Sequence, residues 1–154
     1  MNISLEHPAQ PDVVALIEEL DAYQKPLYPP ECHYGIDIAA LAQPQVLFAV
    51  ARDEVRRAVG CAAVVLGADY GEIKRMFVRP QHRGGGVARA LLAYLEARAA
   101  AQACTLLMLE TGIYQYEALA FYERAGFERC AAFGDYPQDP FSVFMRKRVA
   151  ASQA

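Results

Sequence analysis

Three consecutive glycines stand between an apolar run and a helical pattern, in the segment MFVRPQHRGGGVARALLAYLE. Glycine has no side chain, so Gly84, Gly85 and Gly86 can bring bare backbone N–H groups close to a single point. A helix that begins directly after them adds the partial positive charge of its N-terminus. Together these features predict an anion site suited to a phosphate or a pyrophosphate.

Two common phosphate-binding patterns do not fit this loop. A P-loop requires a lysine and then serine or threonine after its last glycine, whereas Val87 and Ala88 follow here. A dinucleotide fingerprint requires glycine or alanine at the position of Arg89. The loop is therefore an anion site of another kind, and a plain turn that caps the helix is the alternative.

The loop and two further segments together resemble the GCN5-related N-acetyltransferase family. The run Arg83-Gly-Gly-Gly-Val-Ala88 resembles its pyrophosphate loop, R/Q-x-x-G-x-G/A. EALAFYERAGF at 117–127 resembles its A-x-x-x-Y-x-x-x-G-F helix, and GEIKRMFV at 71–78 resembles the strand before the loop. These matches keep the family order and spacing between about residues 46 and 147. LETGIYQYEALAFYERAGF with FGDYPQDPFSVFMRK is similar to a bacterial subgroup of uncharacterised acetyltransferases.

The resemblance implies acetyl-CoA as the cosubstrate and no metal. The pyrophosphate is expected on the loop N–H groups, and the pantetheine arm is expected to pair with the strand 76–78. The N–H of Val78 or Phe77 would then face the acetyl carbonyl as an oxyanion donor. Gln115 stands where many relatives carry an asparagine that contacts the arm. The expected cofactor-binding residues are Met76, Phe77, Val78, Arg83, Gly84, Gly85, Gly86, Val87, Ala88, Gln115, Ala118 and Tyr122.

Acyl transfer to an amine needs an acid for the leaving thiolate and a base for the amine. The resemblance implies that Tyr122 is the acid, with a half-buried core aromatic as the alternative. Glu72 begins the strand that carries the acetyl group and is the candidate base, directly or through water; a solvated carboxylate is equally open. Glu110 is the second choice. Lys74 shares a strand face with Glu72, and pairing between them would weaken Glu72 as a base.

Substrate contacts are expected from the irregular segment 27–38 and the loop 134–141. Acidic and aromatic residues there suit a cationic amine, although ordinary loop polarity explains them equally well. The candidates are Tyr28, Glu31, His33, Tyr34, Asp135 and Tyr136, together with Glu110. The predicted function is transfer of the acetyl group of acetyl-CoA to a primary amine of a small molecule, peptide or protein by direct attack. The alternatives are another acyl-CoA, or a non-enzymatic acetyl-CoA sensor.

Composition limits the class of protein. A chain of 154 residues with 55% hydrophobic content favours one domain over residues 1–154, and a net charge of −3 argues against nucleic acid as a partner. The four scattered cysteines predict reduced thiols in a cytoplasmic protein, and the three histidines supply no metal-ligand spacing. The N-terminus lacks a signal-peptide pattern, and no apolar run approaches a membrane span, so no membrane partner is expected. A homodimer is compatible with the sequence.

Hydrophobic periodicity predicts the elements that must position these residues. Strands are expected at 2–6, 46–51, 58–66, 72–78, 105–110, 127–133 and 142–147, and helices at 11–25, 87–101 and 115–125, with a short helical piece within 27–45. This order predicts an α/β (α+β) fold, and the resemblance implies a mostly antiparallel sheet of six to seven strands flanked by about four helices. The helix between 72–78 and 105–110 makes these two strands a parallel pair, which the resemblance implies is splayed.

Overall fold

The computed structural model, which describes residues 1–32 and 36–151, contains one twisted, mixed sheet. Its strand order is β1-β2-β3-β4-β5-β7-β6, and every neighbouring pair is antiparallel except β4 and β5. The predicted fold class and the predicted parallel pair are therefore confirmed. The strands are β1 (Asn2–Leu5), β2 (Val46–Arg52), β3 (Ala58–Leu66), β4 (Gly71–Val78), β5 (Leu106–Gly112), β6 (Glu128–Cys130) and β7 (Ser142–Arg148).

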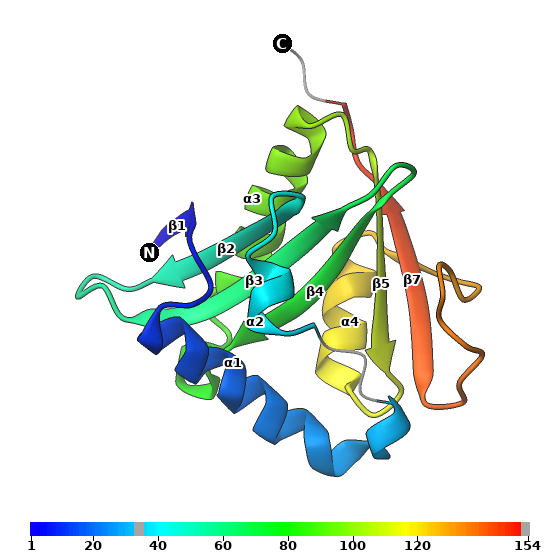
Figure 1. Cartoon of the computed structure of the whole chain (residues 1–154), viewed down its shortest axis with the longest axis horizontal. Helices are drawn as coiled ribbons and strands as arrows, with labels where there is room; N and C mark the ends of the chain where they lie inside the picture. The colour runs from blue at the N-terminus through cyan, green and yellow to red at the C-terminus, as the bar shows by residue number, and fades with distance from the viewer. Residues whose placement is uncertain (33–35, 152–154) are drawn as a thin grey trace.

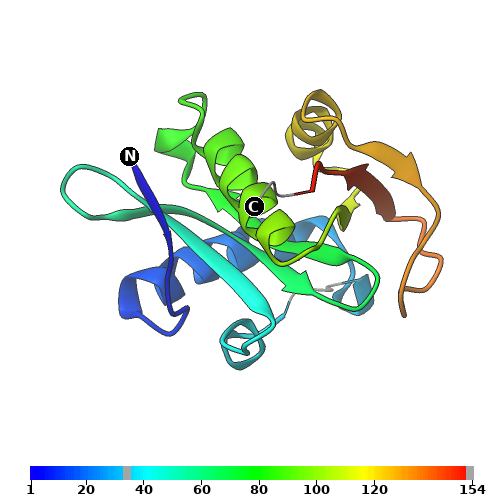
Figure 2. The same ribbon diagram turned by 90° about the horizontal axis from the view of Figure 1, so that it is seen from above.

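Helices cover both faces of the sheet (Figures 1 and 2). Figure 2 shows α1 and α2 on one face and α3 and α4 on the other. The four α-helices found in the described residues are α1 (Pro11–Gln24), α2 (Ile38–Leu41), α3 (Val87–Ala101) and α4 (Tyr116–Arg124). Three 3₁₀ turns are η1 (Lys25–Leu27), η2 (Pro30–Cys32) and η3 (Pro80–His82). The short helical pieces expected between 27 and 45 are η2 and α2.

Each helix layer buries the apolar stripe that its periodicity predicts. Val13, Leu16, Ile17 and Leu20 of α1 pack with Phe48 and other residues on one face of the sheet. On the other face, Val87, Leu91, Leu92 and Leu95 of α3 join a second core cluster that includes Tyr122 of α4. The sheet therefore separates two cores, and Tyr122 belongs to the α3/α4 side.

Two strands end at least two residues away from their expected ends. Strand β5 ends at Gly112, two residues later than predicted, because Glu110, Thr111 and Gly112 still pair with β7. Strand β6 is only three residues long, instead of the seven predicted at 127–133. The chain leaves the sheet after Cys130 because Phe133 packs instead against Tyr136 and Phe144.

Strands β4 and β5 separate after a short paired segment. Their parallel register covers only Gly71–Ile73 opposite Leu107–Leu109, so the remaining residues of β4 and β5 diverge. Figure 1 shows the two strands opening away from each other with α4 behind them. A β-bulge near Arg75 accompanies this divergence, because Arg75 has a φ of 59° and the β3 register shifts there. The splay implied by the resemblance is present.

A buried arginine ties β2 to the start of α1. The guanidinium of Arg52 donates to both carboxylate oxygens of Glu6 and to Asp12 at 2.6 Å, while only 7% of its side chain is exposed. The hydrogen bond from Arg52 lowers the pKa of Glu6 and that of Asp12 from their ordinary values. Arg52 thus anchors the N-terminal segment to the sheet.

Replacement of Arg52 by methionine is expected to lower the free energy of unfolding by about 3 kcal/mol, because two carboxylates lose a buried partner. The free energy of unfolding of the wild-type protein should be constant above pH 4.5, the ordinary pKa of a glutamate such as Glu6. It should fall as the pH drops through the lowered pKa values of Glu6 and Asp12. The variant should lose part of this acid slope. Urea titrations between pH 3 and pH 7 measure both effects.

The matched control is Arg146→Met, because Arg146 pairs with Glu128 while 53% and 69% of the two side chains are exposed. Its stability should change by no more than about 0.5 kcal/mol. Equal losses in the two variants would contradict a structural role for the Arg52 cluster.

Candidate active site

A cavity of about 340 Å³ lies where β4 and β5 diverge. Because the strands are unpaired there, the cavity receives side chains from both faces of the sheet. Lys74 and Glu110 reach it from the α1/α2 side, where strand alternation places them opposite Ile73 and Leu109. Ala118 and Tyr122 reach it from the α3/α4 side. The cavity therefore connects the two faces through the sheet.

The glycine loop forms the start of α3 beside this cavity. Gly84 and Gly86 have φ angles of 83° and 85°, a left-handed conformation that glycine adopts without strain. A Cβ on either residue would meet no atom within 4 Å, so the space beside both backbones is open. In the described residues, no backbone acceptor receives the N–H of Gly84, Gly85 or Gly86. The loop therefore fits a phosphate group, as its sequence predicts.

The edge of β4 that faces the cavity carries backbone groups without a neighbouring strand. The Arg79 N–H donates to the Val59 carbonyl, and in an antiparallel ladder the backbone groups of successive residues point alternately toward and away from the neighbouring strand. The backbone groups of Phe77 therefore point toward β3, and those of Val78 point toward the cavity. The Val78 carbonyl accepts from Arg83 Nε at 2.9 Å, in agreement with this direction. The N–H of Phe77 thus points to β3, so Phe77 is not a suitable oxyanion donor. Of the two predicted donors, the N–H of Val78 remains. The same alternation places Met76 on the open edge.

Tyr122 lies at the cavity wall from α4. Only 5% of the residue is exposed, and its ring packs edge-on against Phe127. Burial raises the pKa of Tyr122, so its hydroxyl stays protonated at neutral pH. In the described part of the chain, no hydrogen bond to this hydroxyl is found, although the residue lines the cavity. A proton donor is therefore available on the α3/α4 side.

Glu110 lies at the cavity wall from β5. Its carboxylate accepts a hydrogen bond from the Ser142 hydroxyl at 2.7 Å. Burial raises the pKa of Glu110, while the Ser142 hydroxyl and the Lys74 cation oppose that shift. A carboxylate whose pKa is raised toward neutrality is better suited to accept a proton than an ordinary surface carboxylate.

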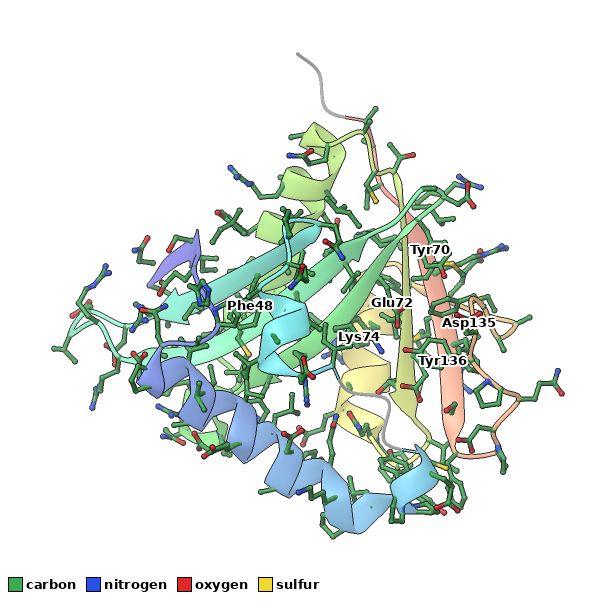
Figure 3. The ribbon with its side chains drawn as sticks, viewed as in Figure 1. Phe48, Tyr70, Glu72, Lys74, Asp135 and Tyr136 are labelled. Carbon is green, nitrogen blue, oxygen red and sulfur yellow. The ribbon has the colours of Figure 1, made fainter. Side chains whose placement is uncertain are left out.

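Glu72 points into a polar cluster rather than into the cavity. Its carboxylate lies 3.1 Å from Lys74 Nζ and accepts a hydrogen bond from the Tyr136 hydroxyl, and Lys74 also donates to Tyr136. Burial and the bond to Glu72 raise the pKa of Tyr136. Figure 3 shows the three side chains gathered together, with Tyr136 reaching them from the β6–β7 loop. We call Glu72, Lys74 and Tyr136 the polar cluster; of its members, only Lys74 lines the cavity.

An aromatic corner closes the cavity at the end of β5. The rings of Tyr28 and Phe141 lie 6.3 Å apart at 78°, and Tyr28 stacks on Tyr114 at 5.8 Å. The Tyr28 hydroxyl accepts from the Tyr114 N–H at 3.3 Å. A Cβ on Gly112 would overlap the Tyr28 ring, so glycine is needed for this close approach. Tyr28 and Phe141 both line the cavity.

The structure brings half of the predicted site residues together at the cavity wall. Tyr28 and Glu110 line the cavity, as do Met76, Phe77, Val78, Arg83, Ala88, Gln115, Ala118 and Tyr122. The Gln115 side chain accepts a hydrogen bond from Thr111 Oγ1.

Other predicted residues lie elsewhere. Val87 is buried in the α3 core, while Glu31 and Asp135 are exposed and outside the cavity lining. Tyr136 contacts the polar cluster instead of the cavity. The predicted contacts His33 and Tyr34 fall outside the described residues.

Several cavity residues were not predicted from the sequence. Leu20, Tyr23 and Gln24 line the wall from the end of α1, and Arg124 contributes from α4; Cys32 and Phe141 lie in the two predicted substrate segments but were not singled out there. Tyr23 and Gln24 follow Leu20 by three and four residues, so the three side chains lie on one face of α1. This helical spacing is the sequence signal that could have identified them. Arg124 gives no such signal, because the predicted helix motif assigns no role to its position.

Residues 1–32 and 36–151 contain no group of three or more His, Cys, Asp or Glu side chains placed to hold a metal ion. Over the same ranges, no helix combines the length and the apolar character that crossing a bilayer requires.

Comparison with known proteins gives consistent matches along the chain. Residues 13–127 match the model of the acetyltransferase (GNAT) family. The chain is 45% identical over 149 residues to the IAA acetyltransferase of Azospirillum brasilense, covering 96% of this chain and 97% of that protein. It is 34% identical over 154 residues to the uncharacterized N-acetyltransferase YsnE of Bacillus subtilis (strain 168), covering 97% and 100%. A Klebsiella pneumoniae crystal structure assigned as an acyl-CoA N-acyltransferase superposes with a TM-score of 0.83 at 39% identity, covering 97% of each chain.

Proposed function

Because the chain belongs to the GNAT family of acetyltransferases, we propose that it moves the acetyl group of acetyl-CoA directly to a primary amine of a small molecule. Residues 1–154 act as a single domain in this proposal. The observation that carries it is the convergence on one cavity of an open strand edge at Val78, a buried hydroxyl at Tyr122 and a carboxylate at Glu110. The glycine loop beside this cavity supplies N–H groups for a phosphate.

Each part of this site has a separate binding role. The N–H groups of Gly84–Gly86 and the first turn of α3 hold the pyrophosphate. The open edge of β4 pairs with the amides of the pantetheine arm as an added strand would. The N–H of Val78 or Met76 donates to the thioester carbonyl, where negative charge develops during transfer. Acetyl-CoA supplies the activated acetyl group.

The transfer itself forms one bond and breaks one. The neutral amine nitrogen attacks the thioester carbonyl carbon, a C–N bond forms, and the C–S bond breaks with its electron pair staying on sulfur. Glu110 accepts the proton that the amine loses, and Tyr122 donates a hydrogen bond and then a proton to the thiolate. Glu110 then releases its proton to solvent, and solvent returns a proton to Tyr122. The products are an N-acetylated amine and free coenzyme A.

Glu110 takes the role of base in this proposal, and Glu72 takes a supporting one. Glu110 lines the cavity, whereas Glu72 is held by Lys74 and Tyr136. A base must lie within hydrogen-bond reach of the proton that it accepts. Glu72 therefore holds Lys74 and the loop that carries Tyr136.

Replacement of Gly86 by alanine is expected to weaken acetyl-CoA binding by about 10-fold, or about 1.4 kcal/mol. The added methyl group would stand in the open space beside the loop, at a left-handed backbone position. Calorimetric titration with acetyl-CoA measures the change. Gly126→Ala is the control, because Gly126 is also left-handed, with φ 100°, but follows the C-terminal end of α4 instead of starting α3. Unchanged affinity in folded Gly86→Ala would mean that the loop is only a turn.

The proposed function is tested by thiol release from acetyl-CoA across a panel of amines. Turnover that depends on both acetyl-CoA and an amine, with the acetylated amine identified by mass spectrometry, is the expected result. Tight acetyl-CoA binding without turnover of any amine would instead support a sensor. Faster turnover with a longer acyl-CoA would indicate a different acyl donor.

A further inference from the structure

We propose that the acceptor is an arylalkylamine: an aromatic ring joined by a short chain to a primary amine, with no carboxylate beside the amine. This inference rests on the proposed acetyl transfer and specifies the substrate class of the same cavity. It concerns the acceptor side, which we define as the cavity wall formed by Tyr28, Lys74, Arg75, Glu110 and Phe141. Its charges and its aromatic surface both point to this class.

Glu110 carries the negative charge of the acceptor side. Its contact within hydrogen-bond distance is the neutral Ser142 hydroxyl, and no cation of the described residues lies within ion-pair distance of it. A half-buried carboxylate without an ion-pair partner favours a cationic ligand. An ammonium group that enters here would form an ion pair with Glu110. It loses its first proton to solvent before attack, so Glu110 is ionised when it accepts the proton that the amine loses during transfer.

The two cations of the acceptor side are already committed to protein groups. Lys74 is held in the polar cluster by Glu72 and Tyr136 and lies over the Tyr136 ring at 5.0 Å (Figure 3). Arg75 pairs with Asp21 at 2.6 Å and donates from two nitrogens to the Ile36 carbonyl. A carboxylate on the acceptor would have to displace one of these partners, which costs binding energy.

The other cations that line the cavity, Arg83 and Arg124, lie outside β4 and β5, beside the glycine loop and at the end of α4. Arg83 bonds to the Val78 carbonyl and lies over the Phe77 ring at 5.6 Å. Val78 is four residues beyond Lys74, or about 13 Å along the strand. An amino acid carries its carboxylate one carbon from the amine, so it cannot reach both Glu110 and Arg83.

The aromatic corner gives the acceptor its second contact. The perpendicular rings of Tyr28 and Phe141 accept a flat ring edge-to-face. Tyr28 lies against Gly112, which is on the same strand face as Glu110 and about 7 Å further along β5. A ring in this corner and an amine at Glu110 are therefore separated by a short linker, as in phenethylamine.

Matched substrate pairs test this class in the thiol-release assay. Phenethylamine and tryptamine should show kcat/KM values at least about 100-fold above phenylalanine and tryptophan, because each amino acid adds a carboxylate that lacks a partner. They should exceed butylamine by about 10-fold, because an alkyl chain fills less of the aromatic corner. Spermidine is included as a polycation.

Variants localise the preference. Phe141→Leu should reduce the ratio of phenethylamine to butylamine turnover, since it removes a ring that lines the cavity. Tyr116→Leu removes an exposed ring that does not line the cavity, and its ratio should stay at the wild-type value. An unchanged ratio in folded Phe141→Leu would overturn the assignment of the corner.

The outcomes separate this inference from the proposed function. Turnover that favours amino acids or spermidine would overturn the arylalkylamine class and leave acetyl transfer standing. Acetyl-CoA binding without thiol release for any amine would overturn acetyl transfer itself, and the acceptor class with it.

Discussion

Tyr122→Phe is expected to lower kcat by about 100-fold while acetyl-CoA affinity changes little, because a positioned acid typically contributes about 10²–10⁴-fold. Phenylalanine keeps the ring and its contact with Phe127, so the fold should survive. The hydroxyl is buried and its pKa is raised, so it donates throughout the neutral range.

A thiol-release assay beside an acetyl-CoA titration measures the two effects of Tyr122→Phe. Tyr116→Phe is the control, because Tyr116 lies on the same helix with 71% of its surface exposed and should keep wild-type values. Equal losses in kcat and in affinity would show a uniform contact with the cofactor sulfur instead of acid catalysis. Wild-type kcat, with chemistry rate-limiting, would remove Tyr122 from the mechanism.

Glu110→Gln is expected to lower kcat/KM by about 100-fold, because glutamine keeps the shape of the side chain but cannot accept the proton of the amine. In the wild-type protein the rate should rise as the pH increases through the pKa of Glu110, since only the ionised carboxylate is a base. Burial raises this pKa above the ordinary 4.5, so the rise should lie at higher pH than for an exposed glutamate. The Glu110→Gln variant should lose this rise of the rate with pH.

Glu72→Gln is the matched comparison, because it removes a carboxylate inside the paired segment of β4, opposite Met108, that does not line the cavity. It should keep the acidic limb of the pH profile and change turnover less than Glu110→Gln. The opposite ranking, with the limb lost only in Glu72→Gln, would restore Glu72 as the base.

The regular elements could be predicted because their signals are local. The apolar stripes of α1 and α3 repeat at helical spacing, and Pro11 and Gly86 mark where the two helices begin. The end of β5 and the shortness of β6 could not be predicted, since both depend on pairing and packing with residues far away in the chain. Gly112 stays in β5 because it pairs with Ser142.

The site was predictable where a motif carries it and unpredictable where distant segments meet. The glycine loop and Tyr122 follow from sequence patterns. The choice between Glu72 and Glu110 does not, because both lie on one face of neighbouring strands. The divergence of β4 and β5 and a contact with Tyr136, 64 residues away, decide which carboxylate faces the cavity.

Direct transfer is the central claim, and Cys32 provides its sharpest alternative, because this thiol lines the same cavity and could carry the acetyl group first. The decisive measurement is whole-protein mass spectrometry on samples quenched during turnover with isotopically labelled acetyl-CoA and phenethylamine, alongside analysis of the amide product. Direct attack predicts that the label appears on the amine nitrogen and that the protein keeps its unmodified mass. A labelled acetyl-protein that passes its acetyl group to the amine, or the absence of any labelled amide, would contradict the account.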